Sequence, residues 1–209
     1  ISTSVDLLRR GVSDPEEPCQ TIQRETRQMA RLIDDMLVLT NGGTGRWEYN
    51  YSLVPEDISM SVYEKFVPIF AQKAQELTLQ LPDTALPSVL RMAALEQILS
   101  ILLDNAHSYA PEGSSVQLRV DQCEEGKTRF WVVDHGPGIP DEEKQAVFHY
   151  FYRREAQQQQ ATKKAGHYGL GLSVATELAR LQQGSLTVLD TPGGGATSVL
   201  RCVVHKDRN

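Results

Sequence analysis

The sequence predicts an α+β protein in which a helical hairpin is followed by a two-layer α/β sandwich. Residues 1–41 show only the helical spacing of apolar residues. Residues 47–209 mix helical stretches with short antiparallel strands and lack a regular βαβ alternation, which favours a sandwich. Between the two parts, residues 42–46 contain three glycines and predict a flexible linker, so we place the domain boundary there.

Composition and charge exclude several classes of protein. The 209 residues carry a net charge of −6 with a pI near 5.4, which argues against a nucleic-acid-binding surface. Three widely separated cysteines predict neither a disulfide framework nor a zinc site, and they indicate a reducing, cytoplasmic environment. No apolar run reaches the roughly 20 residues of a membrane span, and the first residues lack a signal-peptide pattern. Because the sequence starts without Met inside a periodic pattern, we expect it to be part of a longer protein.

The N-terminal hairpin is predicted from two helices and a heptad stripe. Residues 2–10 have the pattern of a helix end, and Asp14 followed by Pro15 is a helix start. Two series of residues then recur seven apart, at Ile22, Met29 and Met36 and at Glu25, Leu32 and Leu39, and all of them except Glu25 are apolar. Two helices of this size need a partner to bury the stripe. We expect the same hairpin of a second subunit; packing on the downstream domain is the alternative.

The second domain starts with a predicted strand, helix and strand. Residues 47–54 alternate as a strand, Asp57 caps a helix to about residue 75, and residues 77–81 form the next strand. Apolar residues at helical spacing then predict a buried helix over 95–110, ended by Pro111. Near its end stands Asn105, which is either a helix cap or a ligand for a hard cation such as magnesium.

The remaining elements alternate between strands, helices and one long loop. We expect a hairpin of residues 116–120 and 128–133, a helix from Asp141, a polar loop over 153–166, a helix over 169–182, and strand pairing between 186–189 and 197–204.

Two glycine-containing segments have the chemistry of a nucleotide site. The segment 134–140, D-H-G-P-G-I-P, follows a strand; its carboxylate can accept from an exocyclic amine, and its glycines permit close approach to a flat ring. The alternative is an ordinary acidic turn. The segment 169–172, G-L-G-L, opens a helix, whose free N–H groups favour phosphate. Between them, a loop supplies cations that can reach phosphates, at Arg153, Arg154, Lys163 and Lys164.

The order of these motifs resembles a known family. D-N-A-x-x-Y at 104–109, D-x-G-x-G-I-P at 134–140, V-F-x-x-F-Y-R at 147–153 and then G-L-G-L are similar to the ATP-binding domain of sensor histidine kinases. That domain belongs to the wider group of gyrase, mismatch-repair and heat-shock chaperone ATPases. The segment M-A-R-L-I-D-D-M-L-V-L-T, which ends at residue 40, resembles the second half of the kinase dimerisation and phosphotransfer hairpin.

The resemblance implies a role for each matching residue. Asn105 would coordinate the Mg²⁺ that bridges the ATP phosphates, and Asp134 would bind the adenine amino group. The other residues implied in nucleotide binding are His107, Ser108, Tyr109, Gly136, Gly138, Ile139, Arg153, Lys163, Lys164, Gly169, Leu170, Gly171 and Leu172.

Four positions depart from the family pattern. Ile101 replaces an Asn, Ser108 a Lys, Tyr150 a basic residue and His167 a Gly. The first three remove polar or cationic contacts, each worth about 1 to 3 kcal/mol if made, so weak nucleotide affinity is one expectation. Ile101 also stands where hydrolysing branches carry a Glu, and an aliphatic side chain is no general base, so we predict no gyrase-type ATP hydrolysis.

The phosphoacceptor histidine of the family lies upstream of Ile1 by this resemblance. None of the histidines present has the expected H-E/D-x-x-x-P context, and we expect His135 and His149 to be pocket-side or core polar residues. The resemblance implies a homodimeric sensor kinase whose cytoplasmic segment passes phosphate to a response regulator, with any membrane contact made by upstream segments. A dimeric scaffold without catalysis and a serine kinase of the anti-sigma type are the alternatives.

Overall fold

The computed structural model describes residues 54–83, 92–123, 127–152 and 169–202, together with Cys19 and Thr26, which are helical. The predicted hairpin, the linker, the strand over 47–54 except for Val54, and the loop over 153–166 lie outside the described residues. The domain boundary at 42–46 therefore stays a prediction.

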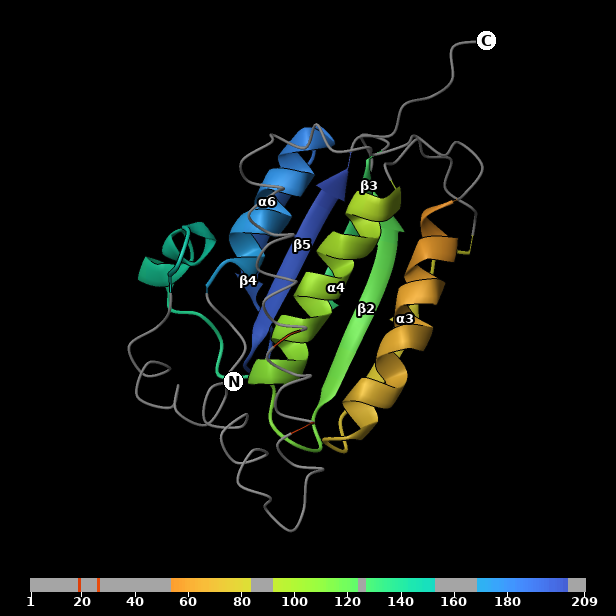
Figure 1. Cartoon of the computed structure of the whole chain (residues 1–209), viewed down its shortest axis with the longest axis vertical. Helices are drawn as coiled ribbons and strands as arrows, with labels where there is room; N and C mark the ends of the chain where they lie inside the picture. Colours follow the sequence, from red (N-terminus) through yellow and green to blue (C-terminus); the bar gives the residue numbers. More distant parts are fainter. Residues whose placement is uncertain are drawn as a thin grey trace.

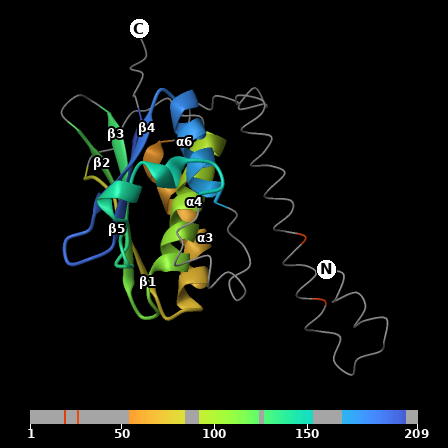
Figure 2. The ribbon, with the colours of Figure 1, turned by 90° about the vertical axis from the view of Figure 1, so that its left-hand side faces the viewer.

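The described residues form a five-stranded sheet covered by helices on one face (Figures 1 and 2). Its strands are β1 (Glu76–Gln80), β2 (Ser115–Gln122), β3 (Thr128–Val133), β4 (Ser185–Asp190) and β5 (Ala196–Cys202), in the order β1-β2-β3-β5-β4. Its helices are α3 (Pro55–Ala71), α4 (Met92–Tyr109) and α6 (Gly171–Leu181). The predicted two-layer sandwich is confirmed.

One strand pairing was not predicted from the sequence, and two local predictions about these elements are wrong. β1 and β2 pair in parallel, so β1, α4 and β2 form one βαβ unit in an otherwise antiparallel sheet. Asp57 does not cap α3: Val54 is the N-cap, Pro55 follows it, and Asp57 lies in the first turn. The helix expected from Asp141 is replaced by two 3₁₀ turns, η1 (Asp141–Glu143) and η2 (Ala146–Phe148), because this segment lacks a continuous apolar stripe.

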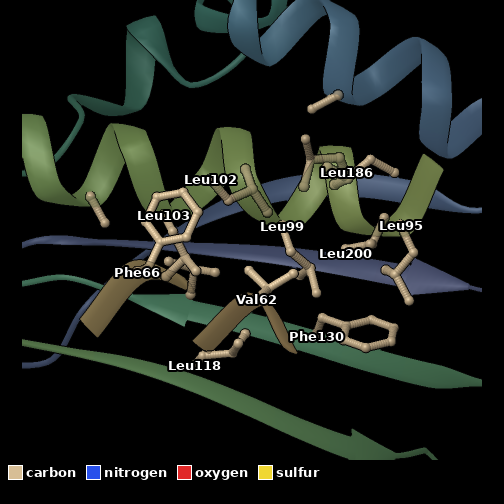
Figure 3. Close-up of a cluster of buried hydrophobic side chains, with 14 of the residues drawn as sticks. Val62, Phe66, Leu95, Leu99, Leu102, Leu103, Leu118, Phe130, Leu186 and Leu200 are labelled. Atoms are coloured by element: carbon tan, nitrogen blue, oxygen red, sulfur yellow. The ribbon is translucent and has the colours of Figure 1, made fainter. Parts of the chain in front are cut away.

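The core lies between α4 and the sheet. In Figure 3, Leu95, Leu99, Leu102 and Leu103 of α4 pack among Phe130 of β3, Leu118 of β2, Leu200 of β5 and two residues of α3, Val62 and Phe66. All of these side chains are buried. Each is worth about 1.5 to 3 kcal/mol of transfer free energy, so this cluster fixes where α4 lies on the sheet.

The face of the sheet opposite α3, α4 and α6 carries a polar cluster around Trp131. Arg119 and Arg129 both lie over the Trp131 ring, 4.7 and 5.1 Å from its centroid, and both pair with the carboxylate of Asp121. Burial raises the pKa of Asp121, but hydrogen bonds from Arg129, Arg119 and Trp131 outweigh it and lower the pKa. The cluster covers β2 and β3 on the side away from α4.

Candidate functional site

Two of the predicted site residues of α4, Asn105 and Tyr109, lie on one face of this helix together with Ile101. A methyl carbon of Ile101, Cγ2, lies 3.2 Å from where a Cβ on Gly171 of α6 would stand. Asn105 is one turn later and Tyr109 two turns later, so they continue the same face towards the end of the helix. Because α4 continues for four residues beyond Asn105, that residue is not at the cap position after the helix.

Asp134 follows β3 and is held by two backbone N–H groups. Its Oδ1 accepts from Gly136 at 2.8 Å and from Ala196 at 3.2 Å, and its own N–H donates to the Ala196 carbonyl. Within the described part of the chain, Oδ2 has no hydrogen-bond donor. One carboxylate oxygen is therefore fixed and the other is left to accept from a ligand.

The electrostatics of Asp134 follow from its half-buried position. Burial raises the pKa of Asp134, and the hydrogen bonds from Gly136 and Ala196 and the nearby His135 only partly oppose that rise. A carboxylate in this state gains from a ligand that donates to Oδ2, because such a hydrogen bond offsets the cost of burying its charge.

Two glycines allow three backbone segments to lie close to one another around Asp134. A Cβ on Gly136 would stand 2.9 Å from Oδ1 of Asp134 and 3.2 Å from the Tyr109 carbonyl oxygen of α4. A Cβ on Gly195, where φ is +118°, would stand 2.0 Å from the Asp134 carbonyl oxygen. The segment after β3, the end of α4 and the turn before β5 thus touch through backbone that only glycine permits.

The second glycine segment lies at the start of α6. The N–H groups of Gly171, Leu172 and Ser173 find no acceptor among the described residues, as is normal for the first turn of a helix. Gly169, with φ of +72°, accepts at its carbonyl from the Phe151 N–H at 2.9 Å. Segments 149–152 and 169–171 are therefore joined, and α6 presents three donors beside Ile101.

These parts together have the chemistry of a nucleotide site. One continuous set of contacts links four features. Within the described residues, they are the Asp134 oxygen that has no donor, the glycines beside it, the amide side chain of Asn105 on α4, and the N-terminus of α6. The structure thus brings together the regions of Asn105, Tyr109, Asp134, Gly136, Gly138, Gly169, Leu170, Gly171 and Leu172.

The sequence predicted His107 beside the nucleotide, but the structure places it on another side of α4. Its ring packs on Phe70 of α3, with centroids 5.1 Å apart, and its Nδ1 lies 2.7 Å from Oε1 of Gln75. Two residues along a helix correspond to about 200°, so His107 and Asn105 are on nearly opposite faces of α4. We therefore leave His107 out of the nucleotide site.

The other predicted residues have less definite positions. Ser108 and Ile139 are half-buried next to the site segments, whereas Arg153, Lys163 and Lys164, like the departure His167, lie outside the described residues. His135 and His149 are exposed, which excludes the core position for both, and the alternative of a pocket-side position stays a prediction. The sequence interpretation missed Ala196, whose N–H donates to Asp134 from 62 residues away, and Gly195, whose backbone lies against that of Asp134. A triple glycine directly before a strand was their only signal.

Comparison with known proteins decides the family. Residues 92–206, more than half of the chain, match the family model described as histidine kinase-, DNA gyrase B- and HSP90-like ATPase. The chain belongs to this family. A curated relative, the sensor histidine kinase WalK of Bacillus subtilis, is 30% identical over 176 residues, which cover 84% of this chain and 28% of WalK. The chain thus spans less than a third of that relative.

Solved structures share the fold. The histidine kinase AdeS of Acinetobacter baumannii matches 98% of this chain and 93% of its own, with a TM-score of 0.75 and 19% identity. Full-length ShkA in complex with AMPPNP matches 94% of this chain and 40% of its own, with a TM-score of 0.75 and 22% identity. Together with the family model and the curated relative, these likenesses identify an ATP-binding domain of the sensor histidine kinase type.

Two features are absent from the described residues. No helix there has the length and apolar character needed to cross a membrane. In the same ranges, no group of three or more His, Cys, Asp or Glu side chains is arranged to hold a metal ion. A magnesium ion at Asn105 would therefore need most of its oxygen ligands from a bound nucleotide and water.

Proposed function

We propose that this chain is the kinase core of a sensor histidine kinase and that it binds Mg-ATP between α4, the segment after β3 and the start of α6. The observation that carries the proposal is Asp134, whose Oδ1 is held by the Gly136 and Ala196 N–H groups while Oδ2 has no donor within the described residues. An adenine amino group is a donor of the kind that Oδ2 lacks. The ShkA complex with AMPPNP, a protein of the same fold, supports a nucleotide as the ligand.

The proposed roles of the other residues follow from their positions. Gly136 and Gly138 would shape the base pocket, because a side chain at either position would meet Asp134, Tyr109 or Gly195. The N–H groups of Gly171 and Leu172 would bind phosphate oxygens at the start of α6. Asn105 would hold Mg²⁺ through its amide oxygen. The ion supplies neutralisation of phosphate charge. Tyr109 and Ser108 would line the same side, and Arg153, Lys163 and Lys164 are proposed to bring cations to the phosphates.

The reaction that we propose is transfer of the γ-phosphoryl group to a histidine upstream of Ile1, followed by relay to an aspartate of a response regulator. The curated relatives named as sensor histidine kinases support this reaction. The heptad pattern of residues 22–39 supports a homodimer formed through the N-terminal hairpin, and the chain would be the cytoplasmic segment of a membrane-associated sensor.

A titration with a fluorescent ATP analogue, with and without Mg²⁺, tests the nucleotide site. We expect binding that strengthens with Mg²⁺ and an Asn105→Ala variant that loses this strengthening, because no other protein oxygen is proposed to replace the amide. A variant with the affinity and Mg²⁺ dependence of the unmodified chain contradicts the role of Asn105. For the transfer step, full-length protein should incorporate label from γ-labelled ATP into a histidine, and nucleotide binding without such labelling contradicts it.

A second candidate function is a dimeric scaffold that binds a response regulator without catalysis. The observation that favours it is the contact between Ile101 and Gly171, which puts an aliphatic group beside the proposed phosphate-binding N–H groups. Ile101 supplies neither a donor nor a metal ligand at that point. Absence of binding at millimolar nucleotide favours the scaffold over the kinase.

A further inference from the structure

A buried glutamine on the far side of α4 from the nucleotide site holds the end of this helix. Gln75 stands between α3 and β1 and is only 5% exposed. Its side-chain nitrogen, Nε2, donates to the carbonyl oxygens of Ala110 at 2.8 Å, Pro111 at 3.1 Å and His107 at 3.3 Å. These carbonyls belong to the last turn of α4 and the residues after it, where a helix has no partners of its own for its C=O groups.

The same carboxamide also fixes the His107 ring. Carbonyl oxygens only accept, so the NH₂ of Gln75 faces them and its oxygen, Oε1, faces His107. The Nδ1 atom of His107 lies 2.7 Å from that oxygen and must therefore carry a hydrogen and donate it. The ring is packed on the fully buried Phe70. Gln75 thus satisfies one side chain and three carbonyls at the end of α4.

The backbone around Gln75 is equally well defined. The Gln75 N–H donates to the Phe70 carbonyl and the Ala74 N–H to that of Ala71, with Ala74 at a φ of +50°. This pair of bonds is a Schellman motif, which ends α3 and aims the Gln75 side chain at α4. Lys73, from the same turn, donates through Nζ to the His107 carbonyl. The end of α3 therefore supplies the cap that α4 lacks.

We infer that Gln75 is a positioning residue for the nucleotide site, which it reaches through the last turn of α4. Asn105, Ser108 and Tyr109 lie on this turn, and the Tyr109 carbonyl contacts the position of Gly136. Lys73 assists through its bond to His107. Without these hydrogen bonds, the end of α4 would shift, and Asn105 would no longer be held in a fixed position relative to Asp134. The inference rests on the proposed function, because it concerns how the same site is held.

The test compares three variants of the chain by titration with a fluorescent ATP analogue and Mg²⁺. Gln75→Met keeps the length of the side chain and removes all four hydrogen bonds of the carboxamide. Lys73→Met removes the bond from Nζ to the His107 carbonyl and leaves those four in place. Val62→Ala is the matched control, because Val62 is a fully buried residue of α3 that packs among the core side chains of Figure 3 and takes part in none of the hydrogen bonds at the end of α4. Thermal unfolding is measured for each, so that affinities refer to folded chain.

We expect the dissociation constant to rise about tenfold in Gln75→Met, as for partners that orient metal ligands, and about threefold in Lys73→Met. Val62→Ala should unfold at a lower temperature and keep the affinity of the unmodified chain. Hydrogen exchange of the Ala110 amide, which donates to the Ala106 carbonyl, should speed up in Gln75→Met and not in Val62→Ala.

Two results would overturn the inference and leave the proposed function standing. One is an unchanged dissociation constant in Gln75→Met while the unmodified chain binds nucleotide. The other is a loss of affinity in Val62→Ala as large as that in Gln75→Met. If Gln75→Met does not fold, an unchanged affinity in Lys73→Met has the same meaning. If the unmodified chain binds no nucleotide at millimolar concentration, the proposed function fails and the inference falls with it.

Discussion

The first and second halves of α4 differ in what surrounds them. Leu95 and Leu99, in the first half, are fully buried among side chains of the sheet and of α3. Asn105, in the second half, is half-buried, and Tyr109 is 41% exposed. The neighbours of this second half on the site side are glycines: Gly171 lies against Ile101, and Gly136 against the Tyr109 carbonyl.

This difference separates stability from binding within a single helix. Packing of the core leucines, Leu95 and Leu99 in the first half and Leu102 and Leu103 in the second, supplies most of the free energy that keeps α4 on the sheet. The close backbone contacts on the site side of the second half add little buried apolar surface, and they set where a ligand can approach. Substitutions of core leucines and substitutions beside the site should therefore have different consequences, which can be measured as unfolding free energy and nucleotide affinity.

The largest effect on stability is expected for Leu99→Ala. Removing a fully buried leucine side chain leaves a cavity, and the unfolding free energy should fall by about 2 to 5 kcal/mol in chemical denaturation. Nucleotide affinity of the folded chain should stay within about twofold, since the site contacts are elsewhere on α4. Glu96→Ala, which removes an exposed side chain of the same helix and its ion pair with Lys65, is the control. It should lower the unfolding free energy by less than about 1 kcal/mol and leave the affinity unchanged. If fully folded Leu99→Ala loses nucleotide affinity, then core packing and nucleotide binding on α4 are not independent.

Gly195→Ala should affect both quantities. The new Cβ would stand 2.0 Å from the Asp134 carbonyl oxygen, so the turn before β5 must move away and release the Ala196 N–H from Asp134. We expect a loss of about 3 kcal/mol in unfolding free energy, together with loss of nucleotide binding.

The matched control for Gly195→Ala is Gly194→Ala. Gly194 also has a positive φ, +106°, but an added Cβ there would meet nothing within 4 Å. The control should therefore show the backbone strain without the clash, and it should keep its nucleotide affinity. Equal loss of binding in both variants would mean that strain in the turn, and not contact with Asp134, explains the effect.

The sequence predicted those parts of the fold that depend on local patterns. Helical spacing from Leu95 predicted α4, and alternation around two turns predicted the β2–β3 and β4–β5 hairpins, because neighbouring strands joined by short turns pair with each other. The parallel pairing of β1 with β2 was missed, since their contact depends on how α4 crosses between them. The cap expected at Asp57 was wrong because Pro55 had already started the helix.

The sequence predicted the motifs of the candidate site, but it did not predict the residues that hold those motifs in place. Asp134 and the glycines stand in recognisable segments of the sequence, and the structure brings those segments together. His107 was misassigned because a sequence motif does not state which face of α4 each of its residues occupies; the ring contacts Phe70 and Gln75 instead. The roles of Gln75 and Ala196 depend on partners 32 and 62 residues away, and no local pattern predicts such contacts.

Asp134→Asn should affect affinity and leave stability intact. The Asn side-chain oxygen can still accept from Gly136 and Ala196, but its NH₂ would then face the ligand and oppose another donor. We expect the dissociation constant for nucleotide to rise about 100-fold.

The raised pKa of Asp134 makes the stability of the unmodified chain depend on pH, and the Asp134→Asn variant removes this dependence. Because burial raises the pKa of Asp134 in the folded chain, the folded state binds this proton more tightly than the unfolded state does. Ionisation therefore costs stability as the pH rises through the raised pKa, and Asp134→Asn should be at least as stable as the unmodified chain at pH 7. A less stable variant at pH 7 would show that the charge of Asp134 supports the fold.

The most direct test of a nucleotide site at the second half of α4 is an NMR titration of the isotope-labelled chain with a non-hydrolysable ATP analogue and Mg²⁺. The account predicts amide shifts at Asn105, Tyr109, Asp134 to Gly138 and Gly169 to Leu172, with the Trp131 indole N–H on the opposite face of the sheet unchanged. Saturable shifts confined to the region of Trp131, or none at millimolar nucleotide, would contradict it.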